Sequence, residues 1–182
     1  MKKLFSLILV MTLVVSVLST GLADGTDLPD MTAFNAQTLE GEPFTQDDLA
    51  ACDLTVVNVW SVTCGPCIRE MPALASFGKA LPDNVQLISI CPDAGMDIET
   101  VKDFLKKVGY EEKTLISGDG DLLSLLRAVM YTPTTFFLDS QGHQVGEVII
   151  GSMPNLAEVY LEAINLALTQ LGKPVIQLAD AA

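Results

Sequence analysis

The fold is decided by one stretch, Thr63-Cys64-Gly65-Pro66-Cys67-Ile68-Arg69-Glu70-Met71-Pro72. An apolar, β-branched run over residues 54–60 precedes it and predicts a buried strand, and a helical pattern over about 65–79 follows it. Two cysteines two residues apart at a strand-to-helix junction suit reversible dithiol/disulfide chemistry. Cys64 would lie at the helix N-terminus, where free backbone N–H groups and the helix dipole favour a thiolate. Cys67 would then be close enough to attack a mixed disulfide formed on Cys64.

The remaining pattern predicts an α/β fold, with a mixed central sheet and helices on both of its faces. A chain of 182 residues suits one domain, here 24–182 with a core of about 28–171. Strands 134–139 and 145–150 are joined tightly and should be antiparallel. The other expected elements, in chain order, are a hairpin at 34–44, a helical turn at 46–51, a strand at 85–91, a helix at 98–108 capped by Asp97, a short edge strand at 115–116, a helix capped by Asp121, and a helix over about 154–171 with Pro154 near its first turn.

The first residues have the layout of a secretory signal. Two lysines precede an apolar stretch over residues 4–17, and small residues at 21 and 23 suit cleavage before Asp24. The uncharged run before Asp24 is also just long enough to span a bilayer. Residues 1–23 are therefore predicted to be either a cleaved signal peptide or an uncleaved membrane anchor. Both alternatives place the domain on the extracytoplasmic side.

The charge balance excludes some classes of partner. The net charge of the full chain is −13, and it becomes more negative without the two N-terminal lysines. Binding to nucleic acid or to an anionic membrane surface needs basic patches, which this composition does not supply. A metal clip is also disfavoured, because zinc prefers four ligands and the chain offers one histidine and two poorly placed spare cysteines.

Those spare cysteines, Cys52 and Cys91, are predicted not to pair with each other. Cys52 precedes the strand 54–60 and Cys91 ends the strand 85–91. If the two strands are parallel, the cysteines lie at opposite ends of the sheet, about 20 Å apart, whereas a disulfide needs a Cα separation below roughly 7 Å. Each is expected to be a free thiol, and Cys91 would emerge at the same sheet edge as Cys64.

Taken together, these motifs resemble the thioredoxin superfamily, and within it the exported TlpA/ResA-like thiol–disulfide oxidoreductases. The resemblance covers roughly residues 28–170. It rests on the Cys64-to-Cys67 tetrapeptide, the upstream Val57-Asn58-Val59-Trp60, the downstream Glu70-Met71-Pro72, Thr132-Pro133-Thr134 ahead of a strand, and the hairpin extension at 34–44. It implies a thioredoxin-like fold with an N-terminal hairpin extension.

The resemblance also implies roles for individual residues. The bond before Pro133 should be cis and lie beside Cys64, with the Thr132 backbone free to pair with an extended substrate segment. Glu70 would be an acidic group near the dithiol that could carry the proton of Cys67. Asn58 stands where cytoplasmic thioredoxins have a buried aspartate, which leaves Glu70 as the candidate. Substrate contacts are further expected from three residues of the motif region: Trp60, Gly65 and Pro66.

The predicted function is thiol–disulfide exchange with partner proteins outside the cytoplasm, with no cofactor beyond the Cys64–Cys67 disulfide. Reducing thioredoxins have the sequence Gly-Pro between their two cysteines, so reduction of partner disulfides is favoured. Apocytochrome c is one substrate class of the family. An exported reductase needs a membrane carrier as its electron donor. The alternatives are a net oxidase, a thiol peroxidase suggested by Ser61-Val62-Thr63-Cys64 but lacking a proline at Val57, and a non-enzymatic binding module.

Overall fold

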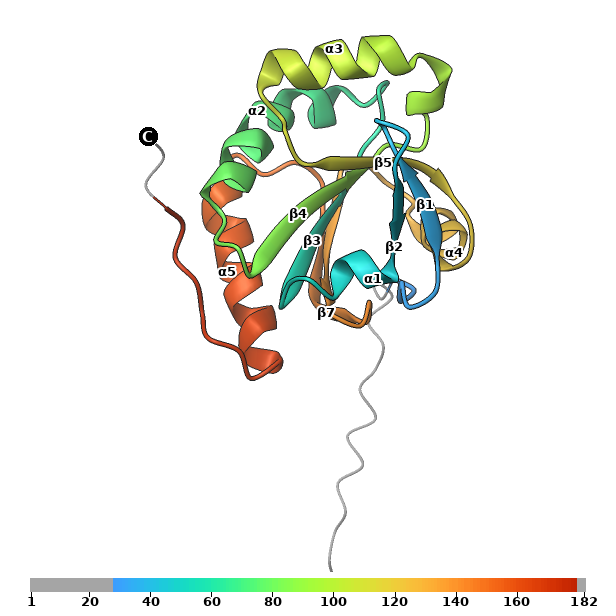
Figure 1. Ribbon diagram of the computed structural model, residues 1–182. Helices are drawn as coiled ribbons and strands as arrows, with labels where there is room; N and C mark the ends of the chain where they lie inside the picture. Colours follow the sequence, from blue (N-terminus) through green and yellow to red (C-terminus); the bar gives the residue numbers. More distant parts are fainter. Residues whose placement is uncertain (1–27, 180–182) are drawn as a thin grey trace, which may run out of the picture.

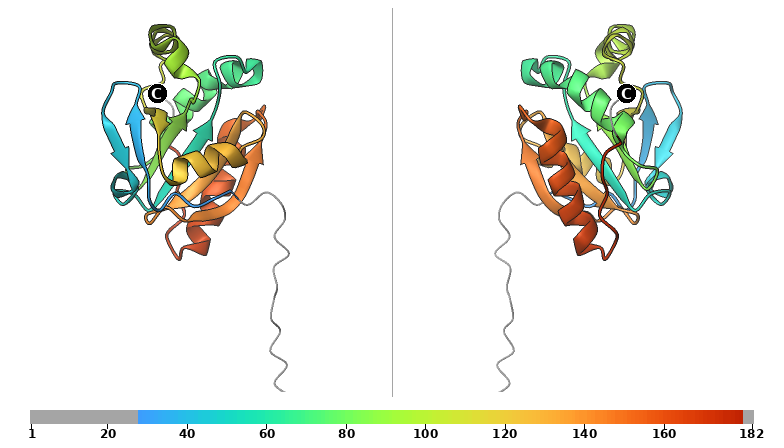
Figure 2. Two further views of the ribbon diagram at one scale, coloured as in Figure 1. Left: turned by 90° about the vertical axis from the view of Figure 1, so that its right-hand side faces the viewer. Right: turned by 90° about the vertical axis from the view of Figure 1, so that its left-hand side faces the viewer.

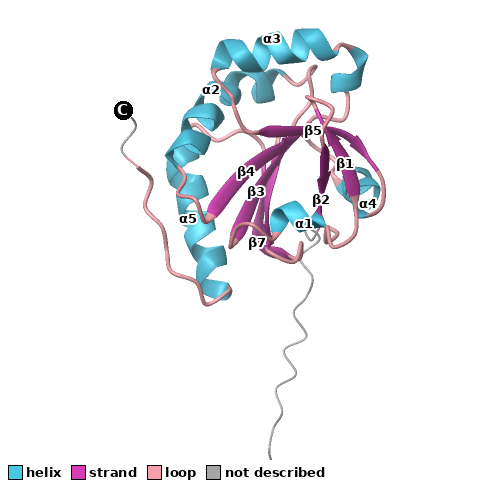
Figure 3. Cartoon of the chain, viewed as in Figure 1, coloured by secondary structure: helices cyan, strands magenta, loops and turns pink. Residues whose placement is uncertain are grey.

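Seven strands form one mixed sheet in the computed structural model, which describes residues 28–179. Their order across the sheet is β2-β1-β5-β4-β3-β6-β7, and Figures 1 and 3 show them as a continuous twisted layer. The strands are β1 (Asn35–Thr38), β2 (Pro43–Thr45), β3 (Leu54–Val59), β4 (Val85–Ile90), β5 (Lys113–Gly118), β6 (Thr134–Asp139) and β7 (Gln144–Ile150).

The central strands are parallel and the outer ones antiparallel. β3 pairs with β4 in parallel and β4 pairs with β5 in parallel, whereas β6 runs antiparallel to β3 and β7 antiparallel to β6. On the other side, the β1–β2 hairpin adds to β5. The predicted mixed sheet, its hairpin extension and the antiparallel β6–β7 pair are therefore confirmed.

Helices cover both faces of this sheet, and β3 is buried between them. Val56 belongs to the apolar core under α2, α3 and α5, while Val57 and Val59 belong to the core under α1 and α4. This alternation follows from the two-residue period of a strand, and it explains why the run over residues 54–59 is continuously apolar or neutral. In Figure 2 the left view faces α4 and the right view faces α5. The helices are α1 (Gln46–Leu49), α2 (Gly65–Ala80), α3 (Ile98–Val108), α4 (Asp121–Ala128) and α5 (Leu156–Gln170), with a 3-10 turn, η1 (Ala94–Met96).

Three local predictions need correction. The short edge strand at 115–116 is the interior strand β5, because the β1–β2 hairpin pairs with its outer side. Asp121 is the first residue of α4 rather than its cap, since its carboxylate binds backbone N–H groups of another segment. α5 begins after Asn155, so Pro154 precedes the helix instead of occupying its first turn.

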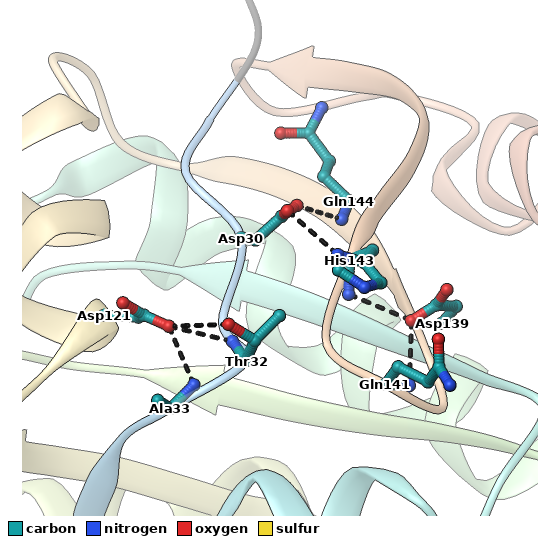
Figure 4. Close-up of polar contacts among 8 residues, drawn as sticks. All are labelled: Asp30, Thr32, Ala33, Asp121, Asp139, Gln141, His143 and Gln144. Atoms are coloured by element: carbon teal, nitrogen blue, oxygen red, sulfur yellow. Dashed lines mark hydrogen bonds and ion pairs between the residues drawn. The ribbon is translucent and has the colours of Figure 1, made fainter.

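That other segment, residues 28–33, lies against the domain (Figure 4). The carboxylate of Asp30 accepts from the backbone N–H of Gln144 at 2.8 Å and lies 3.0 Å from Nδ1 of His143. The carboxylate of Asp121 accepts from the backbone N–H of Ala33 at 2.7 Å. His143, the single histidine of the chain, is half exposed and pairs with Asp30. The chain therefore enters the domain through a hydrogen-bonded segment.

The predicted signal peptide or anchor at residues 1–23 lies outside the described residues. Between residues 28 and 179, no helix is both long enough and apolar enough to cross a membrane. The domain boundaries at 24 and 182 therefore stay predictions.

Candidate active site

A disulfide joins Cys64 and Cys67 at the start of α2. Cys64 is the N-cap residue, and its sulfur accepts from the backbone N–H of Cys67 at 3.2 Å. The two sulfurs differ in exposure, because Cys64 is half-buried whereas Cys67 is 0% exposed. A partner molecule can therefore reach Cys64 first. Gly65 and Pro66, the two residues between them, are exposed beside it, as their predicted role in substrate contact requires.

The loop before β6 faces this disulfide. The Thr132–Pro133 peptide bond is cis, and the carbonyl oxygen of Thr132 lies 3.4 Å from Sγ of Cys64. Both features match what the resemblance implied. Pro133 is buried, and its carbonyl accepts from the backbone N–H of Gly151 at 2.8 Å. The backbone of Thr132 is thus held against Cys64 by a residue that is itself fixed to the end of β7.

Two large apolar side chains precede that loop and remain exposed. Met130 is 77% exposed and Tyr131 is 68% exposed. Thr63, which immediately precedes Cys64, is exposed and polar, so the apolar surface next to Thr132 comes from these two residues. Large exposed apolar side chains beside a reactive centre suit contact with another protein. The sequence signal was available in the adjacency of Met130-Tyr131 to Thr132-Pro133, but it was not used.

Glu70 is buried one turn beyond Cys67 on α2, with 5% of its surface exposed. One carboxylate oxygen, Oε1, accepts from Nδ2 of Asn58 at 3.3 Å. Burial raises the pKa of this carboxyl from 4.5 to about 7, and the hydrogen bond from Asn58 opposes the shift. A solvated helix glutamate is excluded by this burial. The predicted acidic group is therefore buried on α2, three residues after Cys67.

Asn58 connects Glu70 to two residues that the sequence reasoning missed. Its Nδ2 also donates to Oγ1 of Thr135 at 2.9 Å, and that hydroxyl lies 2.6 Å from the hydroxyl of Tyr160. All four side chains are buried. Four elements, α2, β3, β6 and α5, thus contribute one residue each to a chain of hydrogen bonds that ends one turn from Cys67. The Asn58–Thr135 contact follows from the register of β3 and β6, in which these residues are opposite.

Trp60 does not have the role that was predicted for it. Its side chain is 0% exposed, its Nε1 donates to Oγ of Ser89 at 3.3 Å, and its ring packs 6.0 Å from that of Phe104. A side chain enclosed in this way cannot touch a protein substrate. Direct substrate contact by Trp60 is therefore wrong, and the residue belongs to the core beneath the disulfide.

A third missed residue, Asp93, holds the loop that leads to Cys64. Its carboxylate accepts from Oγ of Ser61 at 2.7 Å and from the backbone N–H of Val62 at 3.2 Å. Asp93 lies three residues after the end of β4, and Ser61 lies two residues after the end of β3. Because carboxyl ends of parallel strands meet at one sheet edge, the sequence pattern contained the information needed to place these residues together.

Cys91 and Cys52 are both free thiols, as predicted. The parallel register of β3 and β4, in which Leu54 pairs with Val85, puts them at opposite ends of the sheet. Cys91 is buried, and burial raises its pKa, with the neighbouring Asp93 adding to the effect. A thiol of this kind is protonated and unreactive.

Comparison with known proteins gives consistent results. A family model described as the AhpC/TSA family matches residues 25–144. The chain is 28% identical over 134 residues to "Thioredoxin-like protein YneN" of Bacillus subtilis, covering 73% of this chain and 75% of that protein. It is 27% identical over 122 residues to "Sporulation thiol-disulfide oxidoreductase A" of the same bacterium, covering 66% and 72%. The crystal structure of StoA from Bacillus subtilis aligns with a TM-score of 0.57 at 26% identity, over 71% of this chain and 98% of that structure.

Proposed function

Because the chain belongs to the AhpC/TSA family of thioredoxin-like proteins, we propose that it is a thiol–disulfide oxidoreductase acting on partner proteins through Cys64 and Cys67. Relatives named as thiol–disulfide oxidoreductases, matched over about two thirds of this chain, support the reaction class. The observation that carries the proposal is the position of Cys64 at the N-terminus of α2, with the backbone of Thr132 within 3.4 Å of its sulfur.

The mechanism follows from the unequal exposure of the two sulfurs. In the dithiol form, the thiolate of Cys64 attacks a disulfide of the partner, so that a Cys64–partner disulfide forms and a partner thiolate leaves. Cys67 then loses its proton and attacks Sγ of Cys64. The Cys64–Cys67 disulfide forms, the mixed disulfide breaks, and two electrons have passed to the partner.

The start of α2 favours this chemistry electrostatically. The sulfur of Cys64 already accepts the backbone N–H of Cys67, and negative charge at a helix N-terminus is stabilised by the dipole. The thiolate of Cys64 is therefore the better nucleophile and the better leaving group of the pair. Exposed Met130 and Tyr131, with the Thr132 backbone between them and the sulfur, would bind an extended segment of the partner.

Reduction of exported proteins is the favoured direction, with a membrane reductant carrier as electron donor and cytochrome c maturation as one setting. The Gly-Pro sequence between the two cysteines supports reduction of partner disulfides. The apolar N-terminal sequence supports an extracytoplasmic location, either secreted or anchored. The roles of Thr132, Pro133, Gly65 and Pro66 as partner-binding residues belong to the same proposal.

The reduction potential of the dithiol, equilibrated against glutathione, tests the direction. A value near about −270 mV supports a reductase, and one near about −120 mV identifies a net oxidase. Reduction of insulin disulfides tests the reaction itself: Cys64→Ser should abolish it, whereas the matched control Cys52→Ser should retain it. Disulfide exchange that survives Cys64→Ser would refute the proposal, and rapid consumption of peroxide would point to a thiol peroxidase.

A further inference from the structure

Two buried oxygen atoms, one of them on α2 three residues after Cys67, have no hydrogen-bond partner within the protein. They are Oε2 of Glu70 and Oδ1 of Asn58. Within residues 28–179, the only other buried side-chain polar atom without a hydrogen-bond partner is the hydroxyl of Tyr110. The two oxygens belong to side chains that already bind each other, since Nδ2 of Asn58 donates to Oε1 of Glu70. A buried acceptor left without a donor costs about 1–3 kcal/mol, so two of them in one pair call for an explanation.

The amide hydrogens of Asn58 are not available to bond to either oxygen. Nδ2 has two hydrogens, and both are used, one for Glu70 and one for Oγ1 of Thr135. The Thr135 hydroxyl is in turn held at 2.6 Å by Tyr160. With both of its amide hydrogens donated, Asn58 leaves its oxygen, Oδ1, to accept from a donor outside its own amide group.

One proton on the Glu70 carboxyl gives both oxygens a hydrogen-bond partner. An ionised carboxylate can only accept, and a protonated carboxyl gains an O–H donor. We propose that in the disulfide form Glu70 is a neutral carboxylic acid paired with the Asn58 amide, with Nδ2–H donating to Oε1 and Oε2–H donating to Oδ1, and that Asn58 is the positioning residue for this proton. Burial of the carboxyl, which raises its pKa to about 7, agrees with a neutral form at physiological pH.

The inference deepens the proposed function and rests on it, because it gives the proton of Cys67 a destination. When Cys67 attacks the mixed disulfide, its S–H bond breaks, the carboxylate of Glu70 takes the proton, and the sulfur keeps the electron pair for the new S–S bond. The partner leaves as a thiolate. In the reverse direction the acid returns the proton to Cys67 as the Cys64–Cys67 bond opens.

The titratable groups around Glu70 favour the neutral acid. Cys67 lies on the same helix but does not titrate while it is part of the disulfide. Tyr160 lies on α5, and its pKa is raised mainly by its own burial and then by the charge of Glu70. The described residues place no basic side chain against the carboxyl, and the hydrogen bond from Asn58 is the only interaction there that lowers its pKa. No basic side chain on α2, β3, β6 or α5 therefore compensates a negative charge at this position, and only the hydrogen bond from Asn58 stabilises the ionised form.

Infrared difference spectroscopy of the oxidised protein tests the pair. Below pH 7, wild type minus Glu70→Gln should show the carbonyl stretch of a protonated carboxyl, and Asn58→Leu should keep that band but shift it to higher frequency, because the acid has lost its amide partner. The control Glu112→Gln removes another carboxyl of raised pKa and should leave the band in place. An absent band, or one unmoved in Asn58→Leu, would overturn the inference.

A second measurement needs no change at Asn58, in case Asn58→Leu does not fold. The ¹³C resonance of Asn58 Cγ should titrate with a midpoint near the pKa of about 7 in wild type and be flat in Glu70→Gln. A flat resonance in wild type refutes the pair. The insulin assay separates the two proposals: loss of the band with exchange intact removes only the acid–amide pair, whereas exchange that persists in Cys64→Ser removes the proposed function even if the band is present.

Discussion

The buried carboxyl of Glu70 should make the stability of the oxidised protein depend on pH, and Glu70→Gln should remove that dependence. Folding raises the pKa of this group from 4.5 to about 7. Each pKa unit corresponds to 1.36 kcal/mol, so ionisation should cost the folded state about 3 kcal/mol. Because the side chain is only 5% exposed, solvent screening reduces this value little.

The sign follows from the two protonation states. Below pH 4.5 the carboxyl is protonated in both folded and unfolded chains, so its ionisation does not yet reduce the free energy of unfolding. Between pH 4.5 and about 7 it ionises in the unfolded chain only, so the free energy of unfolding falls as the pH rises. Above about pH 7 the carboxyl is ionised in both chains, and the free energy of unfolding falls no further on its account. Glutamine is neutral throughout and keeps the shape of the neutral acid, so the variant should be the more stable protein at alkaline pH.

Urea unfolding of both proteins, with the Cys64–Cys67 disulfide kept oxidised, measures the effect. The difference in unfolding free energy should be small near about pH 4 and grow to about 3 kcal/mol in favour of Glu70→Gln near about pH 8. Other titrating groups are common to both proteins and cancel in this difference. A variant that is less stable by the same amount at every pH would refute the reasoning, since it would show a structural role without a perturbed pKa.

Three further outcomes are expected. Asp93→Ala should lose about 1–3 kcal/mol of stability and slow insulin reduction several-fold, because the loop before the first cysteine loses two hydrogen bonds; unchanged kinetics would contradict this. The pKa of His143, raised by its hydrogen bond to Asp30, should fall in Asp30→Asn when followed by NMR, and in wild type the hydrogen-exchange protection factors of residues 28–33, which correct for the intrinsic pH dependence of exchange, should fall as the pH rises through that pKa. Native protein should resist alkylation at Cys91 and react at Cys52 first, as mass spectrometry would show; early labelling of Cys91 would count against its burial.

The features predictable from the sequence are those encoded locally. The run over residues 54–59 is apolar because β3 is covered on both faces, and the two cysteines follow it at the strand-to-helix junction. The Thr132–Pro133 dipeptide before a strand is one of the motifs that carry the family resemblance, and that resemblance implied the cis peptide bond. Each of these signals lies within about ten residues, so a single sequence was sufficient to recognise the dithiol and the loop opposite it.

The features that could not be predicted from the sequence depend on which residues of distant strands lie opposite each other. Residue patterning does not reveal that Asn58 lies opposite Thr135, because the register of an antiparallel pair is set by the packed core as a whole. Trp60 was expected to contact substrate because it belongs to the motif region, but its side chain is buried and its hydrogen bond to Ser89 comes from the neighbouring strand β4. For the same reason β5 was mistaken for an edge strand, since its outer partner is the β1–β2 hairpin.

The docked segment at residues 28–33 decides how a tethered form of this protein would face its surroundings. Leu28 and Asp30 bind Gln144, at the end of the sheet where β6 meets β7, and Cys64 lies beyond the opposite end, about one strand length or ~20 Å away. A bilayer attached upstream of Leu28 would therefore adjoin the far pole of the molecule, and the reactive sulfur would project outward. Bulky folded clients could then approach from the aqueous phase without steric conflict with the lipid surface.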